Sequence, residues 1–270
     1  MNSNDPKLTV LLPIYNVAPY LDQAIESVLS QTFKDFEFLI IDDGSTDDSV
    51  AIVEKYTDSR IKLVKHTVNK GLIATLNEGL ALAKGEYIAR IDGDDLWSSP
   101  DKLQMQFSYL HAHSDCVLIG TAATAIDADG HFLYNMLVPI TDEDIQLKML
   151  ATNCFFHPSV VFNKKVALEL GGFLTSDLYV EDYSLWLRMG RTHTLSNIDK
   201  PLLSYRVHTS GVTFKNNLIQ ARNSLKVVKE NKKYYSGYLK ASLKWYIQIA
   251  LLSTLGPQAV QDIRLLFKRG

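Results

Sequence analysis

The stretch Glu86-Tyr87-Ile88-Ala89-Arg90-Ile91-Asp92-Gly93-Asp94-Asp95 runs from a short apolar strand pattern straight into three carboxylates. Neighbouring carboxylates repel one another, and aspartate is depleted in strands, so the cluster needs a cation or several hydrogen-bond donors. Oxygen ligands suit Mg²⁺ and Mn²⁺, which keep open positions for substrate phosphates. The stretch therefore predicts a metal-diphosphate site at the carboxyl end of a strand. For this motif alone, a solvated Asp-Gly turn is the alternative.

Strand and helix patterns alternate on the N-terminal side of this stretch. Apolar runs predict strands at Leu8–Pro13, Phe36–Ile41, Ile61–Val64 and Tyr87–Ile91. Helical spacing of apolar residues separates them, which implies an α/β fold with a mainly parallel central sheet flanked by helices. In such sheets ligands gather at the carboxyl ends of the strands. The loops at 13–16, 42–47 and 92–95 each follow a strand, so we expect them to meet in one crevice.

Capping residues indicate where the first helices begin and end. Pro19 suits the first turn of one helix, and Ser45 or Thr46 is expected to cap a second helix that runs to Tyr56. Gly85 is expected to stop a third helix.

The pattern changes after Pro100. It predicts a helix to His113, a strand at Cys116–Thr121 with two short antiparallel strands around Asp129-Gly130, a helix that opens at Thr141, a helix over Glu181–Met189 and a strand at Leu202–Val207. From Asn216 the chain is predicted to be wholly helical and amphipathic. A helical cap on the sheet is the preferred interpretation. Contact with a membrane surface is the alternative, which the closing Lys268-Arg269 keeps open.

Composition restricts the partners and the compartment. The chain has 270 residues, 46% of them hydrophobic, and a formal net charge of −2, so it has no general attraction to nucleic acid and small-molecule partners are expected. Its two cysteines, Cys116 and Cys154, lack a paired-ligand spacing, which favours a reducing compartment and buried, unpaired thiols. We find neither a secretory signal nor a membrane span, and expect a cytoplasmic protein, with peripheral contact on the inner face of the membrane as the alternative.

Several isolated residues are candidates for chemistry. Glu181-Asp182 opens a predicted helix, where it could supply a catalytic base or simply favour the helix dipole. His157 fits a structural role better than a binding role, whereas His208 stands near a strand end with the two readings balanced. Lys70 and Arg90 could offset the charge of a diphosphate, although isolated cations usually lie on solvated faces.

Five blocks occur together in order: Val10-Leu11-Leu12-Pro13-Ile14-Tyr15-Asn16, Ser27-Val28-Leu29-Ser30-Gln31-Thr32, Ile41-Asp42-Asp43-Gly44-Ser45-Thr46-Asp47, Gly85 to Asp95, and Glu181-Asp182. Together they closely resemble family 2 glycosyltransferases of the GT-A fold. The resemblance is dense from Lys7 to Pro100 and continues more thinly to Thr213. It implies a glycosyltransferase domain over 1–215, with a nucleotide-binding half at 1–100 and an acceptor half at 101–215, followed by a helical extension at 216–270.

The resemblance also implies roles for individual residues in an inverting transfer from a nucleotide-sugar donor, usually a UDP-sugar, with Mn²⁺ or Mg²⁺. Asp182 matches the catalytic base. Pro13 and Tyr15 are expected to flank the nucleobase, Asp43 to accept a hydrogen bond from it, Asp92 to lie near the ribose or the metal, Asp94 to bind the metal, and Asp95 to assist behind it. His208 in Tyr205-Arg206-Val207-His208 resembles a motif that some relatives use near the metal.

The chain departs from the processive synthases of this family, because their Q-x-x-R-W pattern is missing after Asp182. A single-addition enzyme acting on a glycan or lipid-linked glycan is therefore expected, in polysaccharide biosynthesis. A haloacid-dehalogenase-like phosphatase using Asp92 and Asp94 and a non-catalytic nucleotide-sugar binder are the alternatives. The donor sugar and the acceptor stay open, and the aromatic residues of the second half are expected to fill the core rather than bind sugar.

Overall fold

The computed structural model describes residues 5–208 and 216–268, with side chains up to residue 256 in the second range. The described strands are β1 (Leu8–Ile14), β2 (Phe36–Asp42), β3 (Ile61–Lys65), β4 (Tyr87–Arg90), β5 (Leu96–Trp97), β6 (Cys116–Ile126), β7 (Phe132–Met136), β8 (Val161–Asn163) and β9 (Thr194–Arg206). The described α-helices are α1 (Ala18–Leu29), α2 (Ser49–Val53), α3 (Leu72–Leu82), α4 (Lys102–Ala112), α5 (Asp142–Lys148), α6 (Lys164–Glu169), α7 (Glu181–Met189), α9 (Asn217–Asn231) and α10 (Tyr238–Lys268).

These strands form one sheet in the order β3-β2-β1-β4-β8-β6-β9-β5, with β7 paired to β6. The first four are parallel, as predicted, so their carboxyl ends share one edge. Beyond β4 the sheet is mixed, because β8 is antiparallel to both β4 and β6 whereas β6 and β9 are parallel. The short strands β5 and β8 were not predicted, since two or three residues carry too little periodicity to be recognised.

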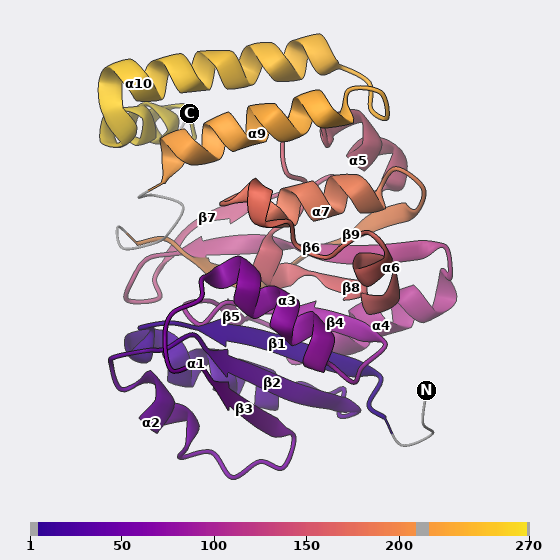
Figure 1. The fold of residues 1–270 in the computed structure, drawn as a ribbon, viewed down its shortest axis with the longest axis vertical. Coiled ribbons are helices and arrows are strands. Elements are labelled where there is room, and N and C mark those ends of the chain that lie inside the picture. The colour runs from indigo at the N-terminus through magenta and orange to yellow at the C-terminus, as the bar shows by residue number, and fades with distance from the viewer. Residues whose placement is uncertain (1–4, 209–215, 269–270) are drawn as a thin grey trace.

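Two apolar clusters cover the two faces of the sheet. On β1, Leu8, Val10, Leu12 and Ile14 belong to the cluster under α1 and α4, whereas Leu11 belongs to the cluster under α3 and α7. This alternation follows from the two-residue repeat of a strand. The molecule is thus a three-layer sandwich, with α9 and α10 stacked beyond α7 at one end (Figure 1). Most of the aromatics of the second half fill this core as predicted: Phe155, Tyr183 and Trp186 are buried.

Two predictions about helices were wrong. The helix expected to run to Tyr56 is α2, which ends at Val53 and has Asp48 at its N-cap. Ser45 does not cap it, because the Ser45 hydroxyl accepts a hydrogen bond from the Asn16 amide at 3.0 Å and so joins two loops.

The C-terminal region is also divided where one helical stretch was expected. It breaks between α9 and α10 at Gly237, whose φ of +78° is a conformation that glycine adopts readily. The predicted domain boundary at 215 and 216 borders residues 209–215, which lie outside the described residues, as do Thr213 and Arg269.

Candidate active site

The three loops after β1, β2 and β4 meet at one edge of the sheet, as predicted. The Asp43 amide donates to the Ile14 carbonyl at 2.9 Å, which joins the first two loops. The third loop lies against the first at Gly93, where a Cβ would stand 2.9 Å from Val17 Cγ1. Only glycine leaves room for this approach without moving Val17. Residues far apart in the sequence therefore converge on the Asp92–Asp95 loop.

Arg90 lies beneath this loop at the end of β4. Its side chain is 1% exposed, and its guanidinium donates to the Ile91 carbonyl and, at 2.5 Å, to Asp92 Oδ1. The positive charge of Arg90 is therefore buried, and it acts on the loop through the ion pair with Asp92. Burial nevertheless raises the pKa of Asp92, with Arg90 opposing and Asp94 reinforcing the shift.

The other two aspartates of the loop are held by the end of β9 and the residues that follow it. Asp95 is 2% exposed and accepts a hydrogen bond from the Arg206 amide at 2.7 Å. Asp94 is 31% exposed on its side chain, and its Oδ2 lies 2.9 Å from His208 Nε2. Burial and the charges of Asp94 and Asp92 raise the pKa of Asp95 well above its ordinary range. Three carboxylates are thus kept together against their mutual repulsion.

The pair Asp94 and His208 fits a hard or borderline divalent cation. The Nε2 and Oδ2 atoms are 2.9 Å apart, which is a hydrogen-bond distance, and both are atom types that bind divalent cations. A carboxylate together with an imidazole suits Mn²⁺ as well as Mg²⁺.

The side chain of Arg206 ties this loop to its surroundings. Its Nε donates to the Asp94 carbonyl at 2.8 Å, its Nη1 reaches the carbonyl of Ala128, and its Nη2 reaches Gln23. A residue at the end of the long strand β9 therefore fixes the backbone that carries Asp94.

Asp182 stands at the start of α7 with Asn153 beside it. Asn153 Nδ2 donates to Asp182 Oδ2 at 2.9 Å, and the preceding Glu181 is 6% exposed. Withdrawal from water raises the pKa of Asp182 to about 6, and the charge of Asp92 adds to this shift. Burial raises the pKa of Glu181 as well, with Asp182 as its second cause. Asp182 thus makes Glu181 harder to ionise, whereas the charge that acts on Asp182 is that of Asp92, so neither carboxylate behaves as a solvated helix-capping acid.

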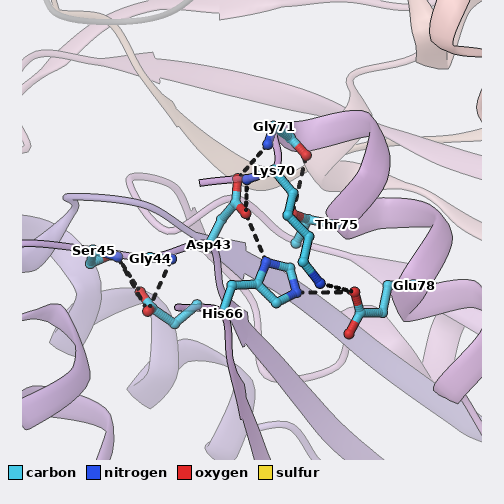
Figure 2. A network of polar contacts seen from close by, with 9 residues as sticks. Asp43, Gly44, Ser45, His66, Lys70, Gly71, Thr75 and Glu78 are labelled. Carbon is cyan, nitrogen blue, oxygen red and sulfur yellow. Dashed lines mark hydrogen bonds and ion pairs between the residues drawn. The ribbon is translucent and has the colours of Figure 1, made fainter. Parts of the chain in front are cut away.

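Asp43, just after β2, is the centre of a polar network that reaches the start of α3 (Figure 2). Its Oδ1 accepts from the Lys70 amide at 2.8 Å and from His66 Nδ1 at 2.8 Å, and its Oδ2 accepts from the Gly71 amide at 2.9 Å. A carboxylate has about four lone-pair sites, so Oδ2 keeps capacity for one more donor. Gly71 has a φ of +88°, a conformation that aims its amide at Asp43 and favours glycine.

His66 extends the network toward α3. Its Nε2 lies 3.0 Å from Glu78 Oε2, and the Lys70 ammonium binds the same oxygen at 3.0 Å. Carboxylate oxygens therefore flank both ring nitrogens of His66. Lys70 thus faces Glu78 in this structure, and its amide, rather than its ammonium, contacts Asp43. The two residues expected beside the nucleobase lie close by, with Pro13 buried in β1 and Tyr15 half exposed just after it.

We predict that His66→Leu weakens nucleoside diphosphate binding by about tenfold, because a buried carboxylate then loses one of its three donors. Isothermal titration calorimetry measures the change. The control is His111→Leu, the same substitution at an exposed histidine on α4. Equal affinities of the His66 variant and the wild type would show that His66 does not position Asp43.

Sequence reasoning did not identify Asn153, Arg206, His66 or Glu78 as site residues. Each acts on a residue distant in the sequence, so no local spacing marks it. Arg206 had the one available signal, since it lies within the quoted Tyr205 to His208 motif.

Two further groups border this assembly. His157 packs against Trp186 and Phe173, with ring centroids at 6.0 and 5.8 Å, and burial lowers its pKa well below the ordinary value, in keeping with a structural residue. In the described part of the chain, Asp127, Asp129 and His131 bring ligand atoms within 4.8 Å of one another on the turn between β6 and β7. Asp129 and His131 are exposed there, and nothing further marks the turn as a metal site.

Known proteins are similar to this chain in sequence and in fold. The family described as Glycosyl transferase family 2 matches residues 9–171. WbnJ, an O-antigen biosynthesis glycosyltransferase of Escherichia coli, is 32% identical over 208 residues, which cover 74% of this chain and 80% of WbnJ. The crystal structure of S. aureus TarS 1-349 in complex with UDP-GlcNAc superposes with a TM-score of 0.68 at 17% identity, covering 92% of this chain and 73% of that one.

A second solved structure is the mannosyltransferase PcManGT from Pyrobaculum calidifontis in complex with GDP-Man and Mn²⁺. It has a TM-score of 0.66 at 18% identity and covers 98% of this chain and 81% of that one. The family match spans more than half of the chain. The two solved structures have the same fold as this chain. The chain therefore belongs to glycosyl transferase family 2 and is a glycosyltransferase with the GT-A fold.

Proposed function

We propose that the protein transfers a sugar from a nucleotide-sugar donor to a hydroxyl of a glycan or lipid-linked glycan, with inversion at the anomeric carbon. The observation that carries this proposal is Asp182, a carboxylate with a raised pKa that senses the charge of Asp92 across the crevice. A transferase needs a base that takes the proton of the acceptor hydroxyl. It also needs groups that hold the positive charge by which the departing diphosphate is stabilised. Asp182 supplies the first and the Asp92–Asp95 loop the second.

The donor in this proposal is a UDP-sugar. TarS is described with UDP-GlcNAc and PcManGT with GDP-Man, so uridine and guanosine donors are both represented among proteins of this fold. Asp43 Oδ2 offers its free acceptor site to a nucleobase N–H, with Pro13 and Tyr15 at the base and Asp92 near the ribose. Lys70 and Arg90 contribute positive charge around the diphosphate, Arg90 through Asp92.

The metal in this proposal is Mn²⁺ or Mg²⁺, which Asp94 and His208 would hold. Asp95 would support these two residues without binding the metal itself. When bound, the metal supplies positive charge that stabilises the departing diphosphate. Asp95 keeps the Asp94 segment in place through its bond to the Arg206 amide.

Asp182 acts on the acceptor. The acceptor hydroxyl oxygen forms a bond to the anomeric carbon while the bond from that carbon to the diphosphate oxygen breaks, and the hydroxyl proton passes to an Asp182 oxygen. Attack opposite the leaving group inverts the configuration. Asn153 orients Asp182 by donating to Oδ2. Tyr179, with a φ of +65° three residues before Asp182, is a candidate for acceptor contact.

The alternatives account for less of this arrangement. A phosphatase of the haloacid-dehalogenase type would need no base at Asp182 and usually carries its first aspartate on an early strand, whereas Asp92 follows the fourth strand, β4. A non-catalytic binder would need no carboxylate pair with raised pKa values.

In this proposal residues 1–215 carry the reaction, with the donor bound mainly by 1–100 and the acceptor by 101–215, while 216–270 form a helical extension. The protein works on the cytoplasmic side, as a single-addition enzyme with peripheral contact at the membrane.

A panel of nucleotide sugars tests the donor class. We expect one UDP-sugar to raise the melting temperature when Mn²⁺ is present and not when EDTA replaces it, because only the folded state binds the donor. Differential scanning fluorimetry measures the shift. Stabilisation by GDP-sugars alone would move the donor to the guanosine class, and stabilisation unaffected by EDTA would contradict metal-assisted binding.

A further inference from the structure

Helix α10 exposes apolar side chains on the side that faces away from α9. Figure 1 shows α10 outermost at one end of the molecule, beyond α9. The exposed side chains recur at helical spacing, so they share one side of the helix. We call this set the outer α10 face: Leu239 (81% exposed), Leu243 (60%), Ile247 (51%), Leu251 (38%) and Leu255 (50%).

The opposite side of the same helix is already used. Ala241, Ser242 and Leu252 are buried, and Leu252 packs with Ala221 of α9. Over residues 238–256 the helix is therefore apolar on both sides, and the packing inside the molecule accounts for only one of them.

The charge around the outer α10 face has a single sign. Residues 231–256 contain four lysines, Lys232, Lys233, Lys240 and Lys244, and no acidic residue, although the whole chain has a net charge of −2. Lys240 lies beside Leu239 and Leu243, whereas the ammonium of Lys244 is bound to the Ala151 carbonyl within the molecule. Lysines that flank an apolar helix face can extend their ammonium groups toward phosphate groups while their stems stay on the apolar side.

We propose that the outer α10 face binds the surface of a bilayer that contains anionic lipids. Charge complementarity selects this occupant, because a second copy docked through the same face would bring four lysines against four lysines with no acid between them. The helix lies on the membrane rather than through it. No helix among the residues that the structure describes combines the length and the apolar content needed to cross a bilayer.

The surface is linked to the active site by direct contacts. On α9, Asn223 Nδ2 donates to the Leu178 carbonyl at 2.8 Å and Lys226 pairs with Asp177 at 3.0 Å, so α9 holds the segment that leads into Asp182. On α10, Lys244 Nζ donates to the Ala151 carbonyl at 2.6 Å, two residues before Asn153. A bilayer bound at α10 is thus held in a defined place relative to Asp182. Together with the transfer reaction proposed above, on which this step rests, the placement of the bilayer favours an acceptor that is linked to a lipid.

Vesicle co-sedimentation of the full chain tests the binding. We expect the wild type to partition onto phosphatidylcholine vesicles that contain phosphatidylglycerol at least about tenfold better than onto phosphatidylcholine alone, and to lose this preference at high salt. Leu243→Glu with Ile247→Glu should reduce binding by about tenfold or more. Both positions are about half exposed, so the fold tolerates the change.

Leu133→Glu with Leu137→Glu, at exposed leucines in and just after β7, is the matched control and should bind as the wild type does. Equal binding by the α10 variant and the wild type, or no binding by the wild type, would overturn the proposal. So would a wild-type dimer that the α10 variant dissociates, since the face would then be an interface between two copies. Donor turnover without vesicles is measured in parallel, and the α10 variant should retain it. Turnover without vesicle binding refutes the membrane surface alone, whereas vesicle binding without turnover refutes the proposed transfer.

Discussion

Asp182→Asn is expected to lower the rate of sugar transfer by about 10²- to 10⁴-fold while nucleotide binding in the presence of Mn²⁺ stays within about twofold of the wild type. The amide keeps the shape of the carboxylate, and its oxygen can still accept from Asn153, so the loss falls on proton removal. Initial rates and titration calorimetry measure the two quantities. Asp48→Asn, at an exposed aspartate before α2, is the matched control and should transfer normally.

The pH dependence provides an independent test of the same residue. Asp182 works as a base only when it is ionised, and its folded-state pKa is raised to about 6. The wild-type rate should therefore fall as the pH falls through about 6, and the residual rate of the asparagine variant should lack this limb. Unchanged transfer by the variant, or the same acid limb in both proteins, would remove Asp182 from the role of base.

Asp94→Ala is expected to abolish the gain in nucleoside diphosphate affinity that Mn²⁺ gives the wild type. The variant removes the carboxylate that lies against His208, and a hard cation prefers carboxylate oxygen to imidazole nitrogen. Titrations with Mn²⁺ and with EDTA should give affinities within about twofold of each other for the variant, and a difference of at least about tenfold for the wild type.

The control for Asp94 is Asp129→Ala, which instead alters the group formed by Asp127, Asp129 and His131. It should keep the full effect of Mn²⁺. If Asp129→Ala removes that effect and Asp94→Ala does not, the metal belongs to the turn between β6 and β7, and the assignment of Asp94 is wrong.

The part of the fold that could be predicted is the part built from local patterns. Buried strands such as β1 are mainly apolar runs, and the helices between the first four strands show apolar residues at helical spacing. This alternation of strands and helices predicted a parallel sheet. The antiparallel β8 is different, because its three residues acquire their place from β4 and β6, which lie far away in the sequence. Its position depends on long-range pairing that no window of sequence contains.

The site divides in the same way. Asp92 and Asp94 stand out because a cluster of carboxylates at a strand end is locally unusual. Asp182 does not, because acidic residues are common in the first turn of a helix, and it was singled out by the resemblance to the family. The residues that support these aspartates do not stand out either: Asn153 is an ordinary loop asparagine, and His66 ends up between Asp43 and Glu78 only after α3 has packed on the sheet. The burial that raises the pKa of Asp182 is likewise a property of the assembled crevice.

The bond that the protein breaks in a nucleotide sugar tests the central claim most directly. The wild type is incubated with Mn²⁺ and the stabilising donor in ¹⁸O-labelled water, and the products are followed by ³¹P nuclear magnetic resonance and mass spectrometry. We expect a nucleoside diphosphate without ¹⁸O, because the anomeric carbon–oxygen bond breaks and any incoming water oxygen goes to the sugar. Inorganic phosphate, a sugar phosphate or an ¹⁸O-labelled phosphate would mean attack at phosphorus, and would contradict the transferase mechanism.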